Sequence, residues 1–100
     1  MRNDVRFAYA LSWHGAWRLL EAVETNLDRA VAEYQKTPRD PDYDLESMAL
    51  ILQDLDAEVA HLKGWFIVFG GVPVNEDASW WDPIERLEDK ISGAYQLLRG

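Results

Sequence analysis

The segment from Asp44 to Phe69 repeats an apolar residue at alternating steps of three and four positions. The residues that form this pattern are Leu45, Met48, Leu52, Leu55, Val59, Leu62, Phe66 and Phe69. Such alternation is typical of an α-helix that packs lengthwise against other helices. Gly70, Gly71 and Pro73 follow at once, which predicts a left-handed cap at Gly70 and the end of the helix.

A second stripe with the same spacing precedes this segment and predicts another long helix. Its members are Trp13, Ala16, Leu20, Val23, Leu27, Ala30 and Tyr34. We expect this helix to begin after Asn3 or Asp4 and to end before Pro38, because the residue before a proline avoids the α conformation. A glycine inside a helix costs about 1 kcal/mol relative to alanine. A kink or break near Gly15, with residues 5–13 as a separate arm, is therefore the alternative to a continuous helix.

The residues from Asp82 to Glu85 have the composition of a helix start. Asp82 is expected to cap the helix, Pro83 fits its first position, and Glu85 stands where a capping box requires a glutamate. The apolar residues that follow at helical spacing are Ile84, Leu87, Ile91, Ala94 and Leu98. A third, shorter helix is therefore predicted to run to about Arg99.

Together these patterns predict an all-α fold, an antiparallel three-helix bundle with two long helices and one shorter C-terminal helix. Residues 37–43 form a short connection, and short connections make consecutive helices antiparallel neighbours; Asp44 is expected to cap the second helix. Residues 1–100 form a single domain of ordinary size. The third helix is too short to cover the whole seam of the first two. An N-terminal arm, the loop 70–81 or another chain must cover the rest, and a homodimer would do so.

The balance of charge is strongly acidic. The chain carries 10 basic and 18 acidic residues, a formal net charge of −8 at neutral pH. Such a surface repels nucleic acid at long range and favours a basic protein partner. The alternative is that the acidity only keeps the chain soluble.

Composition also bears on where the chain works. It holds no cysteine, which excludes a disulfide framework and any thiolate metal site. No apolar run approaches the roughly 20 residues that span a bilayer, and the charged N-terminus leads into no apolar signal region. We therefore expect a soluble cytoplasmic protein without membrane contact.

The residues that catalysis requires are sparse. Glu58 and His61 have the E-x-x-H spacing of di-iron bundles, but such sites need a second pair and two further glutamates. The serines lack the G-x-S-x-G setting of a nucleophile. Glu85, Glu88 and Asp89 lie on one predicted helix, where we expect them to be too solvated to serve as an acid–base pair. We therefore expect no enzyme, no metal site and no cofactor.

Tryptophan is the one residue type used far above its ordinary frequency. The five tryptophans fall in three places, Trp13 and Trp17, Trp65, and Trp80 and Trp81. The first two lie on the apolar stripe, which favours core packing. The segment 64–69 is apolar all round, more than one helix of a bundle buries. Either Trp65 or Val68 should therefore be exposed, or the loop before the third helix should shelter them by packing its tryptophans on this segment.

Acidic residues on the second helix give the most specific functional hypothesis. Asp54 and Glu58 lie one turn apart and Asp56 flanks them, an arrangement of like charges that costs a few tenths of a kcal/mol. Paired with arginine or lysine of a partner, they would instead speed docking. We therefore predict that these three residues contact a protein with a basic surface. The aromatic candidates for the same contact are Trp65, Trp80 and Trp81.

The resulting hypothesis is a small acidic protein-binding module. Its concrete form is an inhibitor or adaptor of phage or mobile-element type, a nucleic-acid mimic that blocks a basic nucleic-acid-binding surface. Anti-CRISPR and anti-restriction proteins share the small size, the acidity and the lack of catalytic motifs, and this analogy rests on size and charge alone. Two alternatives are a structural homodimeric bundle and a metal-dependent enzyme that uses Glu58 and His61.

Overall fold

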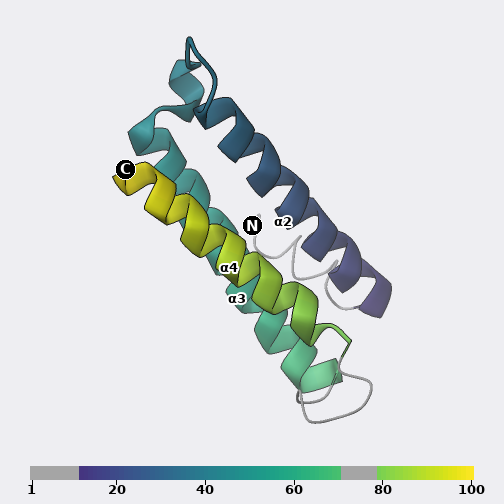
Figure 1. Cartoon of the computed structure of the whole chain (residues 1–100). Helices are drawn as coiled ribbons and strands as arrows, with labels where there is room; N and C mark the ends of the chain where they lie inside the picture. The colour runs from purple at the N-terminus through teal and green to yellow at the C-terminus, as the bar shows by residue number, and fades with distance from the viewer. Residues whose placement is uncertain (1–11, 71–78) are drawn as a thin grey trace.

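The computed structural model describes residues 12–70 and 79–100. These residues form three α-helices and one short 3-10 helix, in the order α2 (Trp13–Tyr34), η1 (Pro41–Tyr43), α3 (Leu45–Gly70) and α4 (Trp81–Arg99). The α-helices run alternately up and down, and α3 contacts both of the others (Figure 1). The predicted all-α three-helix bundle is confirmed.

The first helix of the described chain starts later than the sequence predicts. Ser12 has an extended backbone, with φ −108° and ψ 147°, and its hydroxyl accepts a hydrogen bond of 2.8 Å from the backbone N–H of Gly15. A helix continuous from residue 5 is therefore wrong, because the helix begins at Trp13, after the extended Ser12 and two positions before Gly15. The predicted arm 5–13 and the caps at Asn3 and Asp4 lie mostly or wholly outside the described residues.

The start of α3 agrees with the sequence, and its end is displaced. Asp44 has an extended backbone, and its carboxylate accepts a hydrogen bond of 2.8 Å from the backbone N–H of Ser47. This is the geometry of an N-cap, so the predicted cap is confirmed. At the other end Gly70 is the last residue of the helix. The helix therefore includes Gly70, and because the backbone that follows lies outside the described residues, the left-handed cap stays a prediction.

The start of α4 is a second correction. The helix begins at Trp81, and Trp80 occupies the cap position without any capping hydrogen bond from its side chain. Trp80 has no exposed surface and stacks on Phe66, with ring centroids 5.3 Å apart. This packing, rather than a carboxylate cap, fixes where the helix begins. Asp82 consequently lies in the first turn, where its charge favours the helix dipole but caps nothing.

The core lies between the three helices and follows the predicted stripes except at their ends, and Trp13, which the sequence assigned to the core, is 43% exposed. Its buried apolar residues are Ala16, Leu20, Val23, Leu27 and Ala30 from α2; Met48, Leu52, Leu55, Val59, Leu62, Trp65 and Phe66 from α3; and Trp80, Ile84, Leu87, Ile91 and Ala94 from α4 and its cap. The stripe of α3 fails only at its ends, where Leu45 is 54% exposed and Phe69 65%. Met48 is fully buried, and the 3-10 helix η1 contacts α2 and α3 at that end of the bundle.

Ion pairs join the helices along their edges. Glu24 of α2 lies 3.2 Å from Arg86 and 3.1 Å from Lys90 of α4, and Asp28 lies 2.7 Å from Lys90. No helix within residues 12–70 and 79–100 combines the length and the apolarity that crossing a membrane requires.

Candidate functional site

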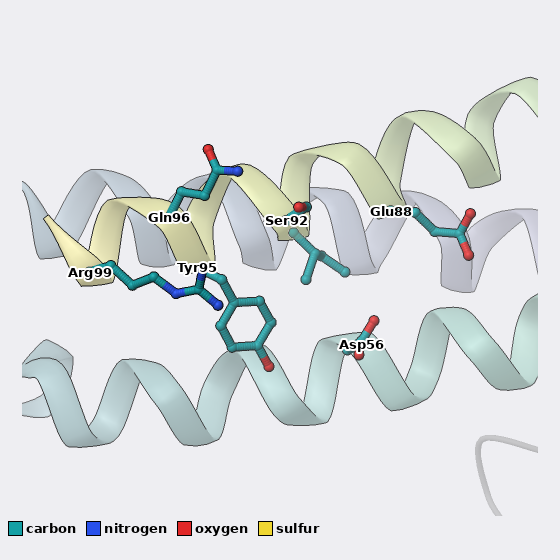
Figure 2. Close-up of a pocket in the computed structure, with 7 residues that line it drawn as sticks. Asp56, Glu88, Ser92, Tyr95, Gln96 and Arg99 are labelled. Carbon is teal, nitrogen blue, oxygen red and sulfur yellow. The ribbon is translucent and has the colours of Figure 1, made fainter.

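A shallow pocket of about 260 Å³ lies between α3 and α4, and we call it the α3–α4 pocket (Figure 2). Its lining residues are Asp56 from α3 and Glu88, Ile91, Ser92, Tyr95, Gln96 and Arg99 from α4. Glu88, Ser92, Tyr95 and Arg99 are spaced by four, three and four positions, which places them along one side of the helix. The periodicity of α4 thus explains why one wall of the pocket comes from so many turns.

The polar groups of the pocket include two acceptors for a cationic ligand, the Asp56 carboxylate and the Tyr95 hydroxyl, together with the guanidinium of Arg99. Tyr95 extends from α4 toward α3 (Figure 2), and burial raises the pKa of its phenol, with a further contribution from the Asp56 carboxylate. The phenol therefore keeps its proton at neutral pH and stays a hydrogen-bond donor as well as an acceptor. Asp56 is exposed and supplies carboxylate oxygens. A guanidinium or ammonium group is the natural complement of these oxygens.

The charges of α4 are sorted by the direction in which they point. Arg86 and Lys90 point to α2, where they pair with acidic residues. Glu88 points to α3, where it lies 3.1 Å from Lys63. Glu85 and Asp89 are exposed, and neither has an ion pair within the described part of the chain. Two of the three cations of α4 therefore pair with α2, Arg99 is exposed at the α3–α4 pocket, and Glu85 and Asp89 remain exposed.

These acidic side chains are contiguous with the α3–α4 pocket. Glu85 lies three positions before Glu88 and four before Asp89, so the three share one side of α4. Glu88 and Asp56 line the same pocket. We call these four residues, Asp56, Glu85, Glu88 and Asp89, the acidic face. Sequence reasoning considered the acids of α4 only as catalysts and missed them as a binding surface, although their spacing was visible.

The structure separates the three acidic residues that the sequence grouped together. Successive residues of an α-helix are turned by about 100°, so Asp54 and Glu58 share one side of α3 while Asp56 points to the other. Asp54 is exposed and Glu58 is partly buried. Only Asp56 reaches the α3–α4 pocket. The three residues therefore do not share one side of α3, and their contact with a partner stays a prediction.

The aromatic candidates lie mainly in the core. Trp65 is 8% exposed and Trp80 is fully buried, while Trp81 is partly buried. Trp80 stacks on Phe66, so the tryptophan before α4 packs on the aromatic segment of α3. Trp80 also meets Trp81 edge to face, with ring centroids 5.2 Å apart. A ring without exposed surface offers a partner nothing to touch, which removes Trp80 from the contact surface. Of Trp65 and Val68, the residue that is exposed is Val68, at 72%.

Trp81 keeps a position at the margin of the acidic face. The ammonium group of Lys63 lies 4.9 Å from the centroid of the Trp81 ring and also contacts Glu88. Such a cation–π contact holds the lysine between ring and carboxylate. Lys63 therefore compensates Glu88, whereas Glu85 and Asp89 have no ion pair within the described residues.

The described residues contain no group of three histidine or carboxylate side chains placed to hold a metal ion. His61 is exposed on α3, and its E-x-x-H partner Glu58 is partly buried. This pair therefore has no third ligand within the described residues.

The fold and the pocket define a class, a small all-α bundle with an acidic helical face. Comparisons with protein-family models, curated proteins and solved structures found no match to this chain.

Proposed function

We propose that this chain is a protein-binding module whose acidic face docks a basic surface of another protein. The observation that carries the proposal is the sorting of charge on α4. Arg86 and Lys90 neutralise α2, whereas Glu85 and Asp89 remain outside as like charges one turn apart. Like charges in this arrangement cost a few tenths of a kcal/mol, a cost that bundle stability does not explain.

A basic partner turns the same arrangement into an advantage. Complementary charge steers the two proteins together and raises the association rate, an effect that salt reduces. At the centre of the contact, the α3–α4 pocket receives one arginine or lysine side chain. Asp56 supplies the carboxylate, and Tyr95 supplies a hydroxyl beside it.

The partner class that we favour is a nucleic-acid-binding protein. Surfaces that bind phosphates are rich in arginine and lysine, and a net charge of −8 favours contact with them while it repels the nucleic acid itself. Occupation of such a surface would inhibit nucleic-acid binding. An inhibitor or adaptor of phage or mobile-element type, similar in size and charge to anti-CRISPR and anti-restriction proteins, is the concrete form of the proposal.

The experiment compares two variants that carry the same change in net charge. One carries Glu85→Gln and Asp89→Asn on the acidic face, and the control carries Glu21→Gln and Glu46→Gln, exposed on other helices. Wild type and both variants are immobilised, and proteins retained from a lysate of the native organism are quantified at two salt concentrations. Each protein retained by wild type is then purified, and its nucleic-acid binding is titrated with wild type and with both variants.

The proposal expects a specific retained protein that wild type and the control displace from nucleic acid and the acidic-face variant displaces several-fold less well. Its retention should fall with salt. Equal displacement by all three chains, or equal loss in the two variants, would show that the acidity acts only as overall charge. Folding of the variants is checked by circular dichroism.

A further inference from the structure

The side chain of Lys63 crosses from α3 to α4 and lies against two groups that attract cations. Its Nζ is 3.1 Å from Oε2 and 3.5 Å from Oε1 of Glu88. The same Nζ lies over the ring of Trp81, 4.9 Å from the ring centroid. A carboxylate binds an ammonium by charge, and the face of a tryptophan ring is the best aromatic partner for a cation. Glu88 and Trp81 together therefore form a site for an ammonium group, and Lys63 occupies it.

This ammonium site belongs to the side of α4 that carries the acidic face. Trp81, Glu85 and Glu88 follow one another at steps of four and three positions, so they share one side of the helix. Glu88 also lines the α3–α4 pocket. Lys63 comes seven positions after Asp56, two helical turns further along the same side of α3. A cation of the chain itself therefore occupies part of the surface on which a basic partner would dock.

The contact between Lys63 and Glu88 is partly open to water. The side chain of Lys63 is 30% exposed and that of Glu88 is 39% exposed. An ion pair with this exposure contributes little to stability, because solvent screens both charges. A lysine also has a flexible stem of four carbons, so its ammonium can turn away from the carboxylate while the helix stays in place. Another ammonium group can then reach Glu88 and Trp81.

We propose that Lys63 is an internal competitor for the basic partner of the acidic face. In the free chain its ammonium occupies the site between Glu88 and Trp81, and in the complex a lysine side chain of the partner takes its place. This inference rests on the proposed function, since it describes how binding to that same surface is regulated. The apparent affinity of a site falls with the fraction of molecules in which the site is open. Lys63 therefore lowers the affinity of the acidic face for its partner.

Removal of the Lys63 ammonium tests the competition. Lys63→Met keeps an apolar stem beside Trp81 and deletes the charge. The control Arg29→Met makes the same change in net charge at an exposed residue of α2. Both variants and wild type are titrated with an end-blocked oligolysine peptide at physiological salt, and backbone amide NMR gives the dissociation constant at the acidic face. Lys63→Met should bind about two- to fivefold more tightly than Arg29→Met, the change that corresponds to a partly exposed ion pair. Equal or weaker binding by Lys63→Met would overturn the proposal.

The displacement can also be followed without any substitution in the binding measurement. The lysines of the chain are Lys36, Lys63 and Lys90. Lysine labelled with carbon-13 at Cε gives one methylene signal for each, and the spectrum of Lys63→Met identifies the signal of Lys63. In free wild type this signal should lie upfield, because the ring current of Trp81 acts on protons above its face. Saturation with unlabelled oligolysine peptide should move it to the position of an exposed lysine such as Lys36, whose side chain is 62% exposed.

Two outcomes separate the internal competitor from the proposed function. Amide shifts at Glu85 and Asp89 together with an unmoved Lys63 signal would overturn the competitor and leave the acidic face as the binding surface. The absence of shifts on the acidic face in wild type and in both variants would overturn the proposed function and the competitor with it. Circular dichroism checks that both variants fold, and the lysine signals test the displacement in the wild-type chain itself.

Discussion

Two aspartates, Asp44 and Asp82, are both predicted from the sequence to cap a helix, but only one of them does so. Asp44 caps α3 through the backbone N–H of Ser47, and this hydrogen bond lowers the pKa of its carboxyl. Asp82 lies inside the first turn of α4, because the packing of Trp80 has already started the helix. A local sequence motif does not predict that packing, because Phe66 belongs to another helix.

The contrast gives a prediction at the scale of the residue. Asp44→Ala should lower the free energy of unfolding at neutral pH, and Asp82→Ala should lower it less, because Asp82 makes no capping hydrogen bond. A carboxyl with a lowered pKa stabilises the fold above its ordinary titration range and loses this effect as the pH falls through the lowered value. The deficit of Asp44→Ala should therefore shrink in acid. Urea denaturation at neutral and acidic pH measures both variants, and equal deficits would contradict the helix boundaries.

The burial of individual tryptophans is hard to predict from the sequence. Trp80 and Trp81 are adjacent and identical in type, yet only Trp80 is fully buried. The helical turn of about 100° between neighbours decides which ring points to the core. To predict which ring points to the core, the first residue of α4 must be known. The apparent cap at Asp82 predicted that residue wrongly.

At the scale of the element, periodicity predicted the three helices well because each must bury one apolar side. It predicted the ends of the helices less well, because their positions depend on capping and on tertiary packing. The ends that differ from the prediction lie at Ser12, Gly70 and Trp80. It also could not find the α3–α4 pocket. The spacing of Glu88, Tyr95 and Arg99 puts them on one side of α4, but only the register between helices places Asp56 opposite them.

The ion pairs between α2 and α4 give a prediction at this scale. Hydrogen bonds from Arg86 and then Lys90 lower the pKa of Glu24. Glu24→Gln should reduce the free energy of unfolding at neutral pH by about 0.5–1 kcal/mol, the range of a partly exposed ion pair. The lowered pKa means that this stabilisation is present above the ordinary glutamate value and is lost as the pH falls below it.

Thermal or urea denaturation of wild type and Glu24→Gln across the acidic range measures this effect, and the two curves should converge in acid. Glu21→Gln is the control, because Glu21 is exposed and has no ion pair in the described part of the chain. A deficit for Glu24→Gln that is as large in acid as at neutral pH would show that packing, not charge, holds α2 and α4 together there.

At the scale of the whole molecule, the net charge of −8 is distributed in a way that the sequence alone does not reveal. Arg86 and Lys90 of α4 pair with acidic residues of α2, and Glu85 and Asp89 remain exposed on the side of α4 that borders the α3–α4 pocket. A second concentration of acids, Asp40, Asp42 and Glu46, lies exposed at and beside η1. We propose that a basic surface of a partner binds the acidic face in preference to this other region.

The most direct test is a titration of isotope-labelled chain with an arginine-rich peptide, followed by backbone amide NMR at physiological salt. We expect the largest shifts at Asp56, Glu85, Glu88 and Asp89, with the backbone amide of Tyr95 also shifted as the pocket fills. The Glu85→Gln and Asp89→Asn double variant should weaken these shifts. Shifts that are largest around Asp40 to Glu46, or spread evenly over all exposed carboxylates, would contradict the claim that the acidic face is the binding surface.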